Sequence, residues 1–173
     1  MSGRGAGRGA RSVLGWVITL ALIGLLQAFL TRGMVDGGRV PALGGQQTDG
    51  QVFAGIAQLP KPALVYIWAS WCGVCRAMQG TLNELAKTHA LVTVATQSGD
   101  RATVSAYMAA HDFHVPTLVD EDGRIARRFG IRGVPALFFI DRQGDIRSVA
   151  SGYTSSWGIR LRLWLAGRPA DDQ

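Results

Sequence analysis

Cys72 and Cys75 are the only cysteines in the 173 residues and stand three positions apart. They lie where an apolar run, residues 63–68, gives way to a helical pattern with Met78 and Leu82. A strand that turns into a helix here places the first thiol at a helix N-terminus, where backbone N–H groups and the helix dipole favour negative charge. The thiolate is the form that attacks disulfides. We therefore interpret Cys72 as the nucleophile and Cys75, one turn deeper, as the thiol that resolves the mixed disulfide.

Three other interpretations of the cysteine pair are open but less favoured. A structural disulfide between residues three apart closes a very small loop and would stabilise little, since the entropic gain grows with loop size. A zinc site needs four ligands, and the chain has no second cysteine pair, while His89, His111 and His114 lack the usual spacing. Two inert buried cysteines are the third. A Cys-x-x-Cys at a strand–helix junction favours redox chemistry, and we expect no metal.

Two stretches resemble one known family. Trp68-Ala69-Ser70-Trp71-Cys72-Gly73-Val74-Cys75-Arg76 resembles the active site of the thioredoxin superfamily. Residues 129–136, Phe-Gly-Ile-Arg-Gly-Val-Pro-Ala, resemble its second signature, a turn with a cis-proline. The resemblance covers roughly residues 45–166. With the apolar segment in front, the chain is most similar to the membrane-tethered TlpA, ResA and DsbE type and to the suppressor-of-copper-sensitivity thioredoxin-like type.

The resemblance implies a fold and a set of site residues. The fold is α/β and thioredoxin-like, a central mixed sheet flanked by helices, with an N-terminal transmembrane helix. The Val134–Pro135 peptide bond is expected to be cis and packed against the disulfide, leaving the Val134 backbone free to pair with a substrate chain by strand addition. Trp71 is placed on the exposed rim, and Trp68 supports the active-site loop from below.

Tyr66 is a departure from thioredoxin, which carries a buried acidic residue at the matching strand position as a proton acceptor for the deeper cysteine. A tyrosine with an ordinary pKa near 10 is a poor base at neutral pH. Deprotonation of Cys75 then relies on water or another group. Glu84 is a weak candidate, and its interpretation as a solvated helix residue is favoured.

The front of the chain indicates export. Residues 13–30 carry no charge and follow three arginines, which predicts an uncleaved membrane anchor with the N-terminus in the cytoplasm; a cleaved signal peptide is the competing interpretation. The formal net charge of +6 is concentrated there, which argues against nucleic-acid binding. The predicted organisation is a disordered basic tail (1–12), a transmembrane signal anchor (13–31), a Gly-rich linker (32–47), a thioredoxin-like domain (48–168) and a C-terminal tail (169–173).

Hydrophobic patterns predict the elements of the domain. Strands are expected at 63–68, 91–96, 117–120, 135–140 and 146–150. Helices are expected from 73 or 74 to 88, around 104–108, around 125–129 and over 155–166. The last helix is expected to turn four large apolar residues inward: Trp157, Leu161, Trp164 and Leu165.

We interpret the chain as a membrane-tethered thiol-disulfide oxidoreductase of the bacterial inner membrane, with its domain facing the periplasm. Its expected partners are thiols and disulfides of exported proteins and a membrane electron donor of the DsbD/CcdA type, and it needs no cofactor beyond the cysteine pair. Gly73 and Val74 supply no charge to stabilise the thiolate, which favours a reductase. The alternatives are a disulfide-forming oxidant and a non-catalytic module that holds a partner or Cu(I) through two soft thiolates.

Overall fold

The computed structural model describes residues 13, 15–25 and 33–168, which belong to two separate units, 1–32 and 33–173. In the first unit, residues 13 and 15–25 are helical. Over the described ranges, no helix combines the length and the apolar character needed to cross a bilayer. The predicted tails, 1–12 and 169–173, lie outside the described residues, as do positions 14 and 26–31 of the predicted anchor.

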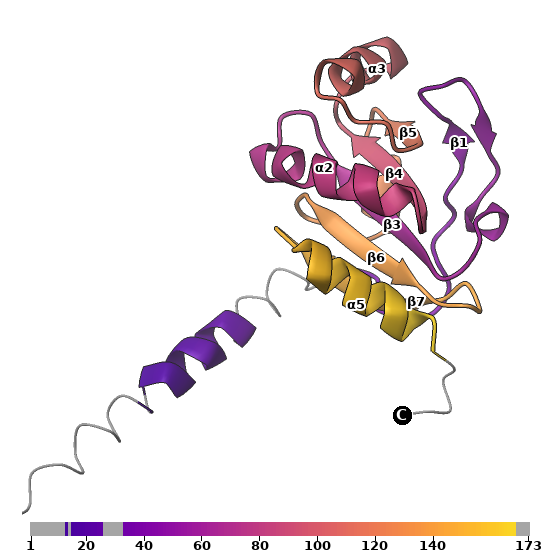
Figure 1. The fold of residues 1–173 in the computed structure, drawn as a ribbon. Coiled ribbons are helices and arrows are strands. Elements are labelled where there is room, and N and C mark those ends of the chain that lie inside the picture. Colours follow the sequence, from indigo (N-terminus) through magenta and orange to yellow (C-terminus); the bar gives the residue numbers. More distant parts are fainter. Residues whose placement is uncertain (1–12, 14, 26–32, 169–173) are drawn as a thin grey trace, which may run out of the picture. The chain divides into compact units, whose positions relative to one another are not determined.

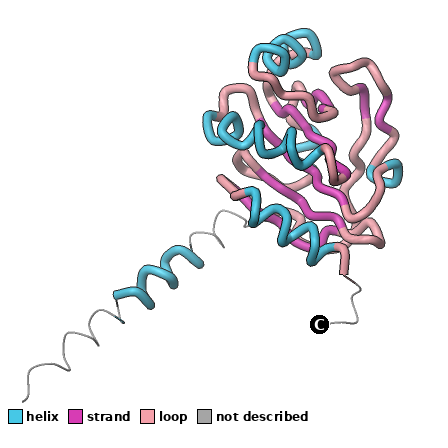
Figure 2. Tube along the Cα trace, viewed as in Figure 1, coloured by secondary structure: helices cyan, strands magenta, loops and turns pink. Residues whose placement is uncertain are grey.

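The second unit is built on a five-stranded mixed sheet, with strand order β5-β4-β3-β6-β7. Parallel pairing joins β3 to β4 and β4 to β5, and antiparallel pairing joins β3 to β6 and β6 to β7. Figures 1 and 2 show the helices packed around these strands. The strands are β3 (Ala63–Trp68), β4 (Ala90–Thr96), β5 (Thr117–Asp120), β6 (Ala136–Ile140) and β7 (Ile146–Ser151).

Four α-helices connect or follow these strands, and a small hairpin precedes them. The helices are α2 (Gly73–Ala86), α3 (Arg101–Ala110), α4 (Arg124–Arg128) and α5 (Ser156–Ala166); the hairpin is β1 (Gly45–Gln46) with β2 (Val52–Phe53), followed by the 3-10 helix η1 (Ile56–Gln58). Figure 1 shows α2 and α5 lying across the same face of the sheet. The order of strands and helices predicted from the sequence is confirmed, with ends that differ by a few residues.

The central strand β3 contributes side chains to two hydrophobic clusters, one on each face of the sheet. All six of its residues are buried, as expected for a strand covered on both faces. Because side chains alternate along a strand, Tyr66 and Trp68 point into the cluster shared with α2, α3 and α5. Val65 and Ile67 point into the opposite cluster, which contains residues of α4 and of the segment before β1, Met34 and Leu43.

The segment predicted as a linker, residues 32–47, belongs to the packed unit from Gly33 onward, and this part of the prediction is corrected. Met34 and Leu43 are buried in the core, and the Val35 N–H donates to the Phe129 carbonyl (3.2 Å). Glycine-rich composition suggested a spacer, but these buried side chains and backbone hydrogen bonds, among them Ile146 N–H to the Gly38 carbonyl (2.8 Å), hold the segment on the domain.

The orientation of α5 also differs from the expectation. Trp157, Leu161 and Trp164 are exposed, and only the half-buried Leu165 is partly covered. The inward positions are held by smaller residues, Ile159, Leu163 and Ala166. Both stripes of the helix are apolar, so the hydrophobic pattern alone did not decide which one faces the sheet.

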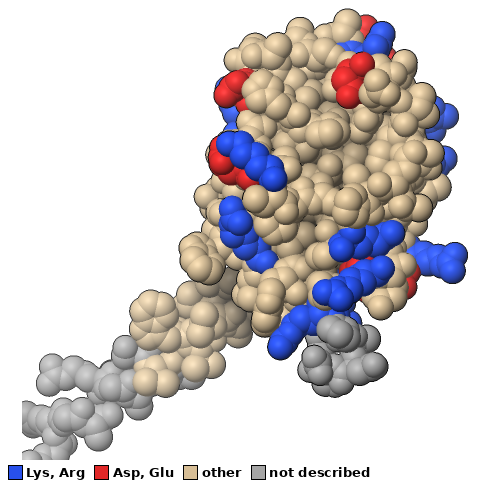
Figure 3. All heavy atoms as spheres, turned by 45° about the vertical axis from the view of Figure 1, so that its right-hand side comes forward, with Lys and Arg blue, Asp and Glu red and all other residues tan. Residues whose placement is uncertain are grey.

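Charge on the second unit is nearly balanced. Residues 33–173 contain fourteen of the 18 basic residues and all 12 acidic ones. Figure 3 shows a wide uncharged surface on one face, with basic and acidic side chains toward its edges, several of them next to one another. The basic excess of the chain therefore resides mainly before residue 33.

Candidate active site

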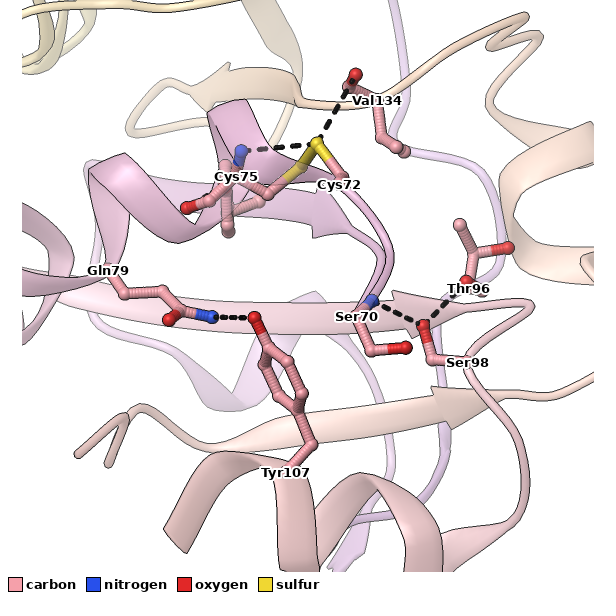
Figure 4. Close-up of a disulfide and its surroundings, with 9 residues drawn as sticks. Ser70, Cys72, Cys75, Gln79, Thr96, Ser98, Tyr107 and Val134 are labelled. Carbon is pink, nitrogen blue, oxygen red and sulfur yellow. Dashed lines mark hydrogen bonds between the residues drawn. A yellow bond between two sulfur atoms is a disulfide. The ribbon is translucent and has the colours of Figure 1, made fainter. Parts of the chain in front are cut away.

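The two predicted redox cysteines are joined in a disulfide at the start of α2 (Figure 4). Cys72 is the N-cap residue of the helix, and its sulfur accepts the backbone N–H of Cys75 at 3.1 Å. Cys72 remains 7% exposed, whereas Cys75 is fully buried. Cys72 is therefore the less buried of the two cysteines, and its sulfur is also the one that faces a backbone N–H of the helix, which favours its thiolate after reduction.

The proline turn lies directly beside this sulfur. The Val134–Pro135 bond is cis, as the resemblance implied, and the Val134 carbonyl oxygen lies 3.7 Å from the Cys72 sulfur (Figure 4). Val134 precedes β6, which begins at Ala136, so it lies outside the ladder of the sheet. A polypeptide that approaches Cys72 thus meets the Val134 backbone, which takes no part in the pairing of β6.

Tyr66 lies beneath the deeper cysteine. Its hydroxyl donates to the Cys75 carbonyl oxygen at 3.4 Å, and its side chain is completely buried. Burial, with a smaller contribution from Tyr107, raises the pKa of Tyr66 well above its usual value near 10. The phenol therefore stays protonated at neutral pH and does not act as a base for Cys75.

Two carboxylates of the described residues come into question as a base for Cys75, and both are engaged elsewhere. Asp120 is the one carboxylate buried within the described residues, and it accepts the backbone N–H groups of Ile125 (2.8 Å) and Ala126 (3.0 Å) at the start of α4. Glu84 is exposed and pairs with Lys87 at 2.7 Å, which confirms its interpretation as a solvated helix residue. Neither carboxylate is therefore placed to accept the Cys75 proton.

The two tryptophans occupy the predicted places. Trp68 is fully buried, and its indole N–H donates to the Thr93 hydroxyl at 3.1 Å. Trp71 is 64% exposed beside Cys72, and its indole N–H donates to the Gln97 carbonyl at 3.1 Å. Trp71 therefore presents a large apolar surface at the mouth of the site while one end of it is fixed.

Sequence reasoning missed the role of Ser98, which does not cap α3 but links β4 to the active-site loop. The Ser98 hydroxyl accepts the backbone N–H of Ser70 (2.9 Å) and donates to the Thr96 carbonyl (2.9 Å), as Figure 4 shows. Asp100 caps α3 instead, accepting from the Thr103 N–H at 2.8 Å. A serine directly after a buried strand was the only signal for this link between β4 and the active-site loop.

The histidines take no part in the site. His111 stacks on Tyr107 with ring centroids 4.0 Å apart, and His114 pairs with exposed Asp112 at 2.7 Å. No three potential metal ligands converge anywhere in the part of the chain that the structure describes.

Comparison with known proteins decides the family. Residues 37–149, more than half of the chain, match the AhpC/TSA family. The chain belongs to the AhpC/TSA family. At the level of class, the prediction of a thioredoxin-like thiol-disulfide oxidoreductase is thereby confirmed.

Relatives of this AhpC/TSA-family chain include two informative proteins. A "thioredoxin-like protein" of Haemophilus influenzae is 38% identical over 107 residues, 61% of this chain and 64% of that protein. The "thiol:disulfide interchange protein DsbE" of Pseudomonas fluorescens biotype C is 34% identical over 145 residues, 76% of this chain and 80% of that protein. The match to DsbE of Escherichia coli spans about half of that protein, 54%.

Solved structures with the same fold include two close in shape. MTB dsbF superposes with a TM-score of 0.66 at 25% identity, covering 73% of this chain and 96% of that one. A thio-disulfide isomerase from Thermus thermophilus gives 0.65 at 27% identity, covering 78% and 98%. These likenesses confirm the thioredoxin-like fold class for this AhpC/TSA-family chain.

Proposed function

We propose that the protein is a membrane-tethered reductase of disulfides in exported proteins. The observation that carries the proposal is the asymmetry of the pair: Cys72 is slightly exposed, and its sulfur receives a helix N–H and lies beside the Val134 backbone, whereas Cys75 is fully buried. Relatives named as thiol:disulfide interchange proteins support the same chemistry.

The exchange proceeds in two steps. The Cys72 thiolate attacks one sulfur of the substrate disulfide, forming a mixed disulfide and releasing the other substrate sulfur as a thiolate. Cys75 then loses its proton to water and attacks the Cys72 sulfur, which breaks the mixed disulfide and releases the second substrate thiolate. Two electrons pass to the substrate, and the chain is left with the Cys72–Cys75 disulfide. A dithiol donor in the membrane, of the DsbD/CcdA type, returns two electrons to it.

The direction of electron flow rests on the residues between the cysteines. Gly73 and Val74 bring no charge to the space between the cysteines. The two residues between the cysteines therefore add no charge that stabilises the thiolate, which supports a reducing rather than a strongly oxidising couple.

The reduction potential of the Cys72/Cys75 pair tests this direction. The full chain is equilibrated with dithiothreitol or glutathione buffers, and the oxidised fraction is measured by thiol alkylation. A value near that of thioredoxin, about −270 mV, is expected for a reductase. A value near that of DsbA, about −120 mV, would make the protein a disulfide donor instead.

Membrane attachment and location are part of the proposal and have their own test. The support is the uncharged stretch 13–30 behind three arginines. In bacterial cells that express the full chain, the protein is expected in the inner-membrane fraction. A membrane-impermeant maleimide added to reduced spheroplasts is expected to label Cys72. Labelling only after lysis would place the domain on the cytoplasmic side.

A further inference from the structure

A small hollow opens beside the disulfide, on the side of Trp71. It has a volume of about 150 Å³, and the disulfide's two neighbours Trp71 and Val134 form part of its wall. Buried Thr96 and Ala126 lie toward its base, and exposed Arg127 and Arg132 lie at its rim. Its complete lining is Trp71, Thr96, Gln97, Gly123, Ala126, Arg127, Ile131, Arg132, Gly133 and Val134.

Several contacts fix the shape of the hollow. The indole N–H of Trp71 is bonded to the Gln97 carbonyl, so one wall is held in place. Arg127 donates from Nη1 to the Asp122 carbonyl oxygen at 2.7 Å, which directs its guanidinium across the start of α4. At Gly123 an added Cβ would lie 3.4 Å from both the Gln97 and the Arg127 side chains, so this corner is closely packed. The hollow is therefore present before any substrate arrives.

The charge around the hollow is positive. Two arginines line it and no carboxylate does. The three ion pairs among the described residues include neither Arg127 nor Arg132. The pair next to Arg127 in the sequence joins Asp122 to Arg124 at 2.9 Å. Arg127 still acts on Asp122 from a distance, because it contributes to the lowered pKa of that carboxyl. Arg132 thus has the less compensated charge of the two.

One polar group at the base of the hollow has no partner. Thr96 is 4% exposed, and its hydroxyl is the single buried side-chain polar atom without a hydrogen bond in the described part of the chain. Figure 4 shows this hydroxyl pointing away from Ser98, which bonds only the Thr96 carbonyl. A buried hydroxyl without a partner is destabilising and calls for an explanation.

We propose that this hollow binds an acidic side chain of the substrate polypeptide, within two residues of the cysteine that Cys72 attacks. The inference deepens the proposed function and rests on it. A substrate strand aligned along Val134 carries side chains on both sides of its reacting cysteine. One of them reaches the space between Trp71 and Arg132, where a carboxylate meets guanidinium groups and lies over the Thr96 hydroxyl. Charge-assisted hydrogen bonds of this kind are stronger than neutral ones, so the hollow selects substrates by sequence.

Matched peptides test the subsite with the full 173-residue chain in detergent micelles. Each peptide carries one cysteine, blocked as a mixed disulfide with uncharged 2-mercaptoethanol, and has either Glu or Gln at one position from −2 to +2. The readout is the ratio of kcat/KM for the Glu peptide to that for the Gln peptide. At one position we expect a ratio of about five to ten, where tenfold corresponds to about 1.4 kcal/mol.

Three variants separate the hollow from general charge effects. Arg132→Gln is expected to lower the ratio below about two, and Thr96→Val to lower it about threefold without lowering the urea midpoint, since no hydrogen bond is lost. Arg160 is an exposed residue of α5 outside the hollow. Arg160→Gln removes the same charge and is expected to keep the Glu-to-Gln ratio of kcat/KM at its wild-type value.

The outcomes distinguish this inference from the proposed function. If all peptides are reduced and the rates for the Glu and Gln peptides differ less than twofold, the subsite is overturned and the proposed reductase function stands. An equal loss in Arg160→Gln and Arg132→Gln would also overturn it, because the preference would then come from net charge. Failure to reduce any peptide would overturn both.

Discussion

A series of buried hydroxyl groups joins Trp68 on β3 to Thr93 on β4 and Thr117 on β5. The contacts show which group donates each hydrogen bond. The Trp68 indole N–H donates to the Thr93 hydroxyl (3.1 Å), the Thr93 and Thr117 hydroxyl oxygens are 2.6 Å apart, and Thr117 donates to the Val115 carbonyl (2.8 Å). Because the Thr117 proton is used at Val115, the hydrogen between the two threonines comes from Thr93. All three side chains are fully buried.

Replacing the threonines by valine, which has nearly the same shape, gives a quantitative expectation. Thr93→Val leaves the Trp68 N–H without an acceptor, and Thr117→Val leaves the Thr93 hydroxyl without one. Each buried orphan group costs about 1–3 kcal/mol. In the double variant the Thr93 hydroxyl is gone, so its penalty disappears and mainly the Trp68 N–H stays unpaired. The double variant should therefore be more stable than the sum of the single effects predicts, by at least about 1 kcal/mol.

Urea unfolding of the wild type, both single variants and the double variant measures this coupling. The midpoints should shift without a change in the slope of the free energy of unfolding against urea. Thr154, on the loop after β7, supplies the control, because β7 is separated from β4 by two intervening strands. Thr93→Val and Thr154→Val should add within about 0.5 kcal/mol. If Thr93→Val and Thr117→Val add equally well, the hydroxyl chain does not act as a unit and this reasoning is refuted.

Three further variants test the site. In Tyr66→Phe the exchange rate at pH 7 should change less than about threefold, since a neutral phenol gives up no proton. The unfolded chain ionises this tyrosine near pH 10 and the folded chain does not, so the wild type loses stability above about pH 10. Urea titrations at pH 9 and pH 11 should show that Tyr66→Phe loses less stability between these two pH values than the wild type does. Asp120→Ala should lower the free energy of unfolding by about 2–4 kcal/mol, measured in urea, because two N–H groups of α4 lose a charged acceptor; an unchanged midpoint would contradict this. Glu84→Gln should leave the pH profile of exchange unchanged, since its carboxylate is exposed and paired with Lys87; a shifted profile would make Glu84 a proton acceptor.

Local patterns were enough to predict the redox pair and the order of strands and helices along the chain, whereas the mixed central sheet came from the family resemblance. Cys72 and Cys75 follow a wholly apolar run, which is typical of a strand covered on both faces, and all six residues of β3 are buried. The position of Val134 beside Cys72 came from the family resemblance, since 62 residues separate them and no periodicity links them.

Features that depend on long-range packing were not predictable in the same way. Met34 and Leu43 are isolated apolar residues in a Gly-rich stretch, and only the finished sheet offers them a surface. Trp157 and Trp164 occupy the exposed stripe of α5, while Ile159, Leu163 and Ala166 are buried against the sheet. Size and hydrophobicity alone favoured the opposite orientation.

The hollow beside Trp71 could not be predicted from the sequence either. It is formed by residues of the active-site loop, the end of β4, α4 and the proline turn. Each of these stretches has an ordinary local role, and the unpartnered Thr96 hydroxyl becomes visible only when they meet.

Trapping of the mixed disulfide tests most directly the claim that Cys72 attacks and Cys75 resolves. Reduced Cys75→Ser and Cys72→Ser chains are incubated with a disulfide-containing protein, quenched in acid and analysed by intact mass and peptide mapping. The structure predicts that Cys75→Ser accumulates a one-to-one adduct through Cys72, while Cys72→Ser, whose remaining sulfur is fully buried, forms almost none. Equal adduct formation through Cys75, or no adduct in Cys75→Ser, would contradict the assigned roles.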